Sequence, residues 1–119
     1  MKRLLIIGAM LGAIAASAFA HANLTRSDPK DGAVLAHSPN ELRMWFSEPI
    51  KVGLSTIEVR DASHGLVDGN DQHADAKDPA LVHLSLAPKL PAGVYKVTWN
   101  AVAQDMHVTK GAFSFRVTR

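Results

Sequence analysis

The side chains best suited to metal chemistry are histidines, of which the chain has six, and it has no cysteine. One histidine lies in the stretch Asp105-Met106-His107, two residues after a carboxylate. In extended backbone, residues i and i+2 leave the same side of the chain, so Asp105 and His107 are predicted to converge on one point. The alternative is a solvated surface pair, which is the commoner fate of such residues.

A second histidine, His21, directly follows a segment that has the features of a secretory signal peptide. Residues 1–20 start with Lys2 and Arg3, continue as an apolar run and end in small residues. The apolar run is short for a membrane-spanning helix, which needs about 20 residues. Cleavage after Ala20 would therefore make His21 the first residue of an exported chain, with a free α-amine beside its ring.

The amine and ring of His21, together with His107 and Asp105, form a donor set suited to copper. An α-amine has a pKa of about 8 and an imidazole one of about 6.5, so both lose a proton readily to a metal near neutral pH. Three nitrogens and one carboxylate oxygen in a tetragonal arrangement favour Cu(II), ahead of Ni(II) and of tetrahedral Zn(II). We therefore predict that His21, Asp105 and His107 bind Cu(II).

The predicted cleavage point is surrounded by three overlapping Ala-x-Ala patterns, and each leaves a different terminus. Cleavage after Ala18 places His21 third in the chain. A histidine in third position also binds Cu(II), through the amine, two deprotonated amides and the ring, without help from Asp105. Cleavage after Ala22 discards the histidine.

The elements that must position these residues are short strands with one apolar face. Apolar and polar residues alternate with a period of two, as in half-buried antiparallel strands. The alternation occurs in segments 42–47, 56–60, 82–86, 95–100 and 113–118. We expect about seven strands in one all-β, immunoglobulin-like antiparallel β-sandwich with Greek-key connections; a small closed barrel is the alternative. The polar stretch 65–79 is expected to be a long loop.

The charge balance argues against two kinds of partner, and the length suits one domain. The chain has 13 Lys and Arg residues against 11 Asp and Glu residues, and without Lys2 and Arg3 the two signs are equal. A neutral domain does not favour binding to nucleic acid or to an anionic membrane surface. We expect a signal peptide over residues 1–20 and a single monomeric copper-binding domain over residues 21–119, a length that suits one core.

A series of motifs runs in order through almost all of residues 21–119. The motifs are His21-Ala22-x-Leu24, Ser27-x-Pro29-x-x-Gly32, Phe46-Ser47-Glu48-Pro49, Leu90-x-x-Gly93-x-Tyr95-x-Val97-x-Trp99, Asp105-x-His107 and Gly111-x-Phe113-x-Phe115-x-Val117. Together they resemble the bacterial copper-resistance protein C (CopC) family. The resemblance implies a periplasmic β-sandwich with a Cu(II) site formed by His21, Asp105 and His107, and it favours cleavage after Ala20.

The chain departs from this family pattern in one respect. Some members carry a methionine-rich loop that binds Cu(I), because thioethers are soft ligands. The corresponding stretch here, 65–79, contains no methionine, so a separate Cu(I) site is not expected.

The remaining histidines are expected to be solvated. His37 could approach the metal as an extra ligand, and His64 with His73 could form an adventitious surface site. His83 lies on the polar face of its strand, where a solvated or a cross-strand role is the default.

Three functions compete for this pattern. The first is a periplasmic protein of copper homeostasis or resistance that sequesters Cu(II) or delivers it to an inner-membrane copper transporter. The second is a small copper monooxygenase with a histidine brace, resembling lytic polysaccharide monooxygenases. The third is a metal-free adhesion or assembly sandwich. We favour the first and expect no enzyme, because so short a chain leaves little room for a substrate surface, and because Asp105 at the metal would favour the Cu(II) state.

Overall fold

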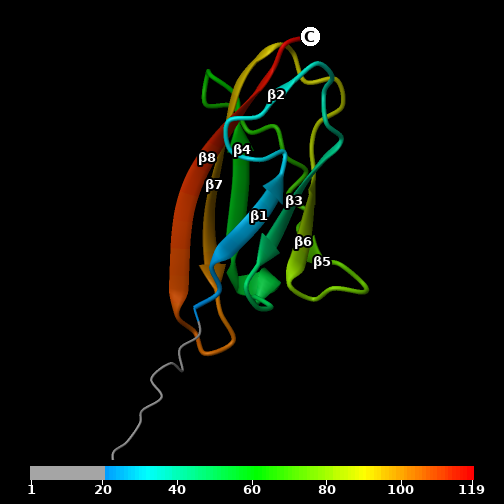
Figure 1. Cartoon of the computed structure of the whole chain (residues 1–119). Coiled ribbons are helices and arrows are strands. Elements are labelled where there is room, and N and C mark those ends of the chain that lie inside the picture. Colours follow the sequence, from blue (N-terminus) through cyan, green and yellow to red (C-terminus); the bar gives the residue numbers. More distant parts are fainter. Residues whose placement is uncertain (1–20) are drawn as a thin grey trace, which may run out of the picture.

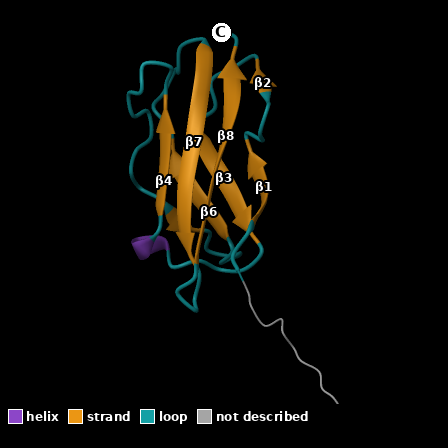
Figure 2. Ribbon diagram, turned by 90° about the vertical axis from the view of Figure 1, so that its left-hand side faces the viewer, coloured by secondary structure: helices purple, strands orange, loops and turns teal. Residues whose placement is uncertain are grey.

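The computed structural model describes residues 21–119, so the predicted leader, residues 1–20, and the predicted cleavage after Ala20 lie outside the described residues. Strands dominate this range, and they form two facing sheets (Figures 1 and 2). The strands are β1 (Leu24–Asp28), β2 (Val34–Leu35), β3 (Glu41–Phe46), β4 (Thr56–Arg60), β5 (His73–Ala74), β6 (Leu81–Ser85), β7 (Gly93–Val102) and β8 (Val108–Val117), with a 3₁₀ turn at Val52–Leu54.

The topology confirms the predicted sandwich. One sheet has the order β1-β3-β6-β5, and all its neighbours pair antiparallel. The other has the order β2-β8-β7-β4, in which the short β2 runs parallel to β8. Within the described range, no helix is long and apolar enough to cross a membrane.

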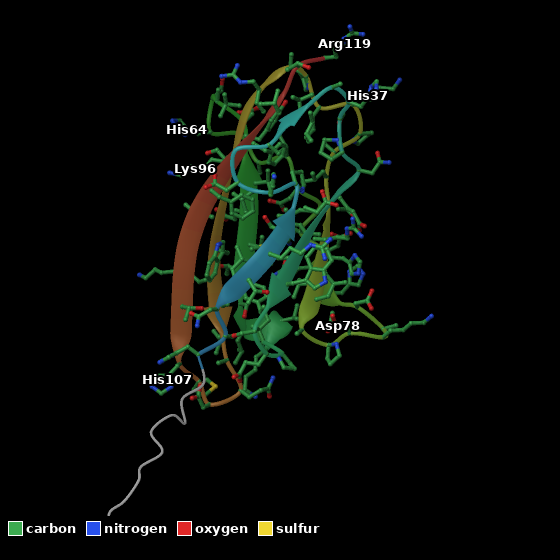
Figure 3. All side chains as sticks on the ribbon, in the orientation of Figure 1. His37, His64, Asp78, Lys96, His107 and Arg119 are labelled. Carbon is green, nitrogen blue, oxygen red and sulfur yellow. The ribbon has the colours of Figure 1, made fainter. Side chains whose placement is uncertain are left out.

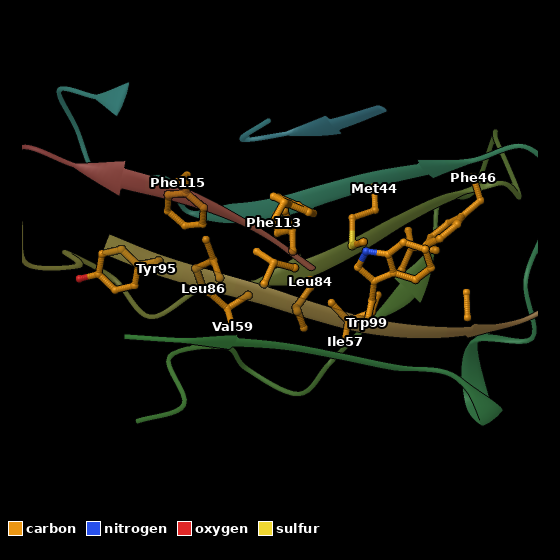
Figure 4. Close-up of a cluster of buried hydrophobic side chains, with 14 of the residues drawn as sticks. Met44, Phe46, Ile57, Val59, Leu84, Leu86, Tyr95, Trp99, Phe113 and Phe115 are labelled. Atoms are coloured by element: carbon orange, nitrogen blue, oxygen red, sulfur yellow. The ribbon is translucent and has the colours of Figure 1, made fainter. Parts of the chain in front are cut away.

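The core lies between the sheets and is formed by the apolar faces that the alternation predicted (Figure 4). Phe115 stacks on Tyr95, and Phe46 meets Trp99 edge to face. The Tyr95 hydroxyl donates to the carbonyl of Pro91, four residues upstream, as in the tyrosine corner of immunoglobulin-like sandwiches. The largest fully buried side chains are Leu42, Met44, Val59, Val82, Leu84, Val97, Phe115 and Val117.

Strand β1 was not predicted from the sequence. Its residues do not alternate cleanly between buried and exposed, and the register shifts between Leu24 and Arg26. A bulge breaks the period of two, because two residues of one strand then oppose one residue of the other.

The stretch 65–79 is tied to the sandwich more closely than a simple loop would be. It contains β5 and two isolated bridges, Leu66 to Arg60 and Asp68 to Leu86. Aspartate side chains add further bonds to the sheets: the Asp68 carboxylate accepts from the Val59 amide, and that of Asp71 from the Ser85 amide. The polar composition that suggested a loop therefore supplies the side-chain acceptors that attach this segment to the sheets.

Candidate metal centre

The turn between β7 and β8 carries Asp105, Met106 and His107, and its backbone is not extended as the sequence argument assumed. The Ala103 amide donates to the His107 carbonyl at 2.8 Å, and the Met106 amide donates to the Ala103 carbonyl at 2.9 Å. Met106 has a positive φ of 73°. The sequence argument assumed extended backbone at Asp105 and His107. That assumption is wrong, because the chain reverses direction at these residues.

Asp105 and His107 nevertheless come together through the turn itself. One Asp105 oxygen accepts from the His107 backbone amide at 3.1 Å, and the other lies 2.9 Å from His107 Nδ1. These two hydrogen bonds, the side-chain one first, lower the pKa of the Asp105 carboxyl. An ionised carboxylate can only accept, so Nδ1 carries the proton and Nε2 of the neutral ring keeps a lone pair for a metal.

His21 reaches the same end of the sandwich because the first described residues are anchored to both sheets. Ala22 is fully buried, and its carbonyl accepts from the Thr109 hydroxyl of β8 at 2.8 Å. On the other side, the Ser47 hydroxyl donates to the His21 carbonyl at 2.9 Å and accepts from the Asn23 amide at 2.9 Å. The backbone at residues 21–23 is thus fixed by bonds to the end of β3 and to the start of β8.

The two histidine rings meet at this point. Their centroids are 5.1 Å apart, with an interplanar angle of 74°. Both residues are solvent-exposed, so an ion could enter without opening the core. The side chains meet in pairs, His21 with His107 and His107 with Asp105; within residues 21–119, no three His, Asp or Glu side chains already surround one metal position.

Two of the supporting residues, Ser47 and Thr109, were not recognised as part of the site from the sequence. Ser47 belongs to the quoted motif Phe46-Ser47-Glu48-Pro49, which was the available signal. Thr109 gave no signal, because its hydroxyl acts across 87 residues of chain.

The sequence of this chain matches a known protein family. The family model described as "CopC domain" matches residues 24–118, which is most of the chain.

The chain belongs to the CopC family.

Several of its relatives carry names that refer to copper. It is 31% identical over 124 residues to copper resistance protein C of Escherichia coli, covering 98% of this chain and 97% of that protein. It is 29% identical over 101 residues to copper transport protein CutJ of Bacillus subtilis, but spans 19% of the length of that protein.

Solved structures of the family have the same fold. CopC from Methylosinus trichosporium OB3b superposes with a TM-score of 0.75 at 26% identity, covering 82% of this chain and 94% of that one. PcoC of Escherichia coli, described as a methionine-rich copper resistance protein, superposes with a TM-score of 0.73 at 30% identity, covering 83% and 100%.

Two of the other histidines in this CopC domain lie far from the candidate site. His37 and His64 lie at the opposite end of the sandwich from His107 (Figure 3). The idea that His37 approaches the metal is therefore wrong, because it lies in the segment between β2 and β3 at the far end of the sheets.

His83 has a cross-strand role, which is one of the two roles expected of it. Its ring binds Asp75 through Nε2 at 2.7 Å and Glu41 of β3 through Nδ1 at 3.0 Å. It also stacks on the ring of His73 in β5, with centroids 5.3 Å apart. The hydrogen bond to Asp75 and then that to Glu41 raise the pKa of His83, although partial burial opposes them.

This arrangement predicts a pH-dependent contribution to stability. A raised folded-state pKa stabilises the fold fully below the unfolded value of about 6.5, and the contribution is lost as pH rises through the folded pKa. We expect His83→Gln to lower the free energy of unfolding more at about pH 6 than at about pH 9. Urea unfolding at both pH values measures the difference, with the exposed His37→Gln as control. An equal loss for His83→Gln at both values would contradict a protonated bridge.

Proposed function

We propose that this chain is a copper-binding protein of copper homeostasis or resistance, exported to the periplasm and holding Cu(II) at the end of its sandwich. Residues 1–20 act as the signal peptide, and residues 21–119 form the exported domain. The chain's membership in the CopC family supports a copper-related function, as do the names of its relatives.

The observation that carries this proposal is the contact of His21 with His107. His21 directly follows the predicted leader, its carbonyl is bonded to Ser47, and its ring lies 5.1 Å from that of His107. Chain ends are usually poorly ordered unless they are attached to the fold. With cleavage after Ala20, as proposed, the new terminus would lie beside the second imidazole.

The chemistry follows from the donors at this end. His21 supplies its α-amine and ring, which close a chelate on one ion, and His107 supplies Nε2. Asp105 orients His107 through Nδ1, and its oxygens have further lone pairs, so the carboxylate can also approach the ion. Nitrogen donors with one carboxylate favour Cu(II).

In this proposal copper is cargo, and the protein is not an enzyme. Exposed ligands at one end of a rigid sandwich suit exchange of the ion with another protein. The partner we propose is an inner-membrane copper transporter, since a relative of this domain forms part of the much longer copper transport protein CutJ.

Copper titration of the processed domain tests the assignment. His107→Ala should lower Cu(II) affinity by more than about 100-fold, because loss of a residue that only orients a ligand already costs about 10- to 100-fold. His73→Ala, which removes an exposed histidine elsewhere, should leave the affinity unchanged. Equal affinity in the two variants would refute the proposed site.

A further inference from the structure

The methionine between the two proposed ligands is exposed, whereas the other methionine of residues 21–119 is in the core. The exposed fraction is 57% for Met106 and 1% for Met44. Met44 therefore fills space between the sheets, as methionine commonly does. Met106 leaves its apolar side chain largely in water, so core packing does not account for a methionine at this position.

The backbone conformation at position 106 does not account for a methionine there either. A φ of 73° lies in the left-handed region, which glycine and asparagine adopt far more readily than a methionine. Such sparsely populated conformations are concentrated at functional sites. Met106 is thus a residue in an unfavourable conformation and an exposed position, directly between Asp105 and His107.

Met106 adds a soft donor atom, its thioether sulfur, to this end of the molecule. Thioether sulfur favours Cu(I), whereas carboxylate oxygen favours harder ions, and imidazole binds copper in either state. The turn therefore holds a hard donor, Asp105, and a soft donor, Met106, on the two residues before His107. The His21 and His107 ring centroids are 5.1 Å apart, and Met106 directly precedes His107 in the turn, so the residues of this end include two imidazoles and one thioether.

We propose that Met106 is a Cu(I) ligand and that, with His21 and His107, it lets the same end of the sandwich bind copper in both oxidation states. This inference rests on the proposed function, because it uses the same two histidines. Cu(I) is taken up as Cu(I), so no electron transfer by the protein is involved. The site is not a separate one in the stretch 65–79; it shares its imidazoles with the Cu(II) site and differs in the third donor.

The test is Cu(I) competition against a chromophoric chelator, without oxygen, on the processed domain and on Met106→Leu. The variant should bind Cu(I) at least about 10-fold more weakly, the scale on which one lost partner lowers metal affinity, and should bind Cu(II) as the parent does. Met44→Leu, a substitution of similar volume in the core, is the matched control and should leave both affinities unchanged. Thermal unfolding of all three proteins verifies that they are folded.

The failure of this inference is distinguishable from failure of the proposed function. If Met106→Leu binds Cu(I) as tightly as the parent, the thioether is not a ligand, whatever happens to Cu(II). X-ray absorption gives a second readout: copper–sulfur scattering should appear in the Cu(I) form of the parent and vanish in Met106→Leu. Its absence from the parent would also overturn the inference. The Cu(II) site itself is tested separately by His107→Ala.

Discussion

Acetylation of the amine of His21 in the processed domain is expected to lower Cu(II) affinity by about 100-fold or more, more than the loss of an orienting residue costs. Acetylation removes the basic amine, whose pKa of about 8 makes it available to a metal near neutral pH, and leaves the imidazole intact. The His21 carbonyl, Ala22 and Asn23 keep their contacts, so the fold should not change. Isothermal titration with Cu(II), in competition with a chelator, measures the difference.

A chain that begins at Phe19 provides the control for this experiment. Its amine, two amides and the ring of His21 can bind Cu(II) by themselves, so its affinity should not depend on His107. The domain that begins at His21 should lose its affinity on His107→Ala. If acetylation leaves the affinity of that domain unchanged, the amine is not a ligand, and the proposed dependence on leader cleavage is wrong.

Phe115→Ala is expected to lower the free energy of unfolding by about 3–5 kcal/mol, the usual range for removing a buried phenylalanine. Phe115 is 2% exposed and stacks on Tyr95, with ring centroids 5.5 Å apart. Since domains are stable by only about 5–15 kcal/mol, a large share of the fold's stability would be lost. Urea unfolding followed by circular dichroism measures the change.

The matched control is the next residue of the same strand. Arg116 is exposed on the outer side of β8, so Arg116→Ala should change stability by about 0.5 kcal/mol or less. A loss for Phe115→Ala that is no larger than this would show that the two sheets do not pack at Phe115. Comparing the two variants separates the stability lost from the core from any loss due to strand pairing in β8.

The position of the candidate site follows from how the sandwich ends. β7 and β8 are the longest strands, and they pair along ten residues each before the turn at 103–107. The first described residues lie at the same end, because Ala22 is part of the core and its carbonyl accepts from Thr109 of β8. A rigid pair of strands and a buried alanine therefore set the distance between the two histidines.

The alternation of apolar and polar residues by itself determined most of the architecture. It located β3, β4, β6, β7 and β8, because a half-buried strand must alternate. It could not locate β1, where a bulge breaks the alternation, or the two-residue strands β2 and β5, which are too short to show a period.

The candidate site was also predicted only in part from the sequence. Residue types alone indicated copper, and the motif Asp105-x-His107 indicated two candidate ligands. Only the tertiary structure decided that the chain turns at Met106, that Asp105 bonds to His107, and that His37 lies at the far end. The meeting of His21 and His107 was also decided there, because contacts such as Ala22 with Thr109, 87 residues apart, depend on how both sheets pack. Local sequence specifies strands and donors, whereas the distance between donors depends on long-range packing.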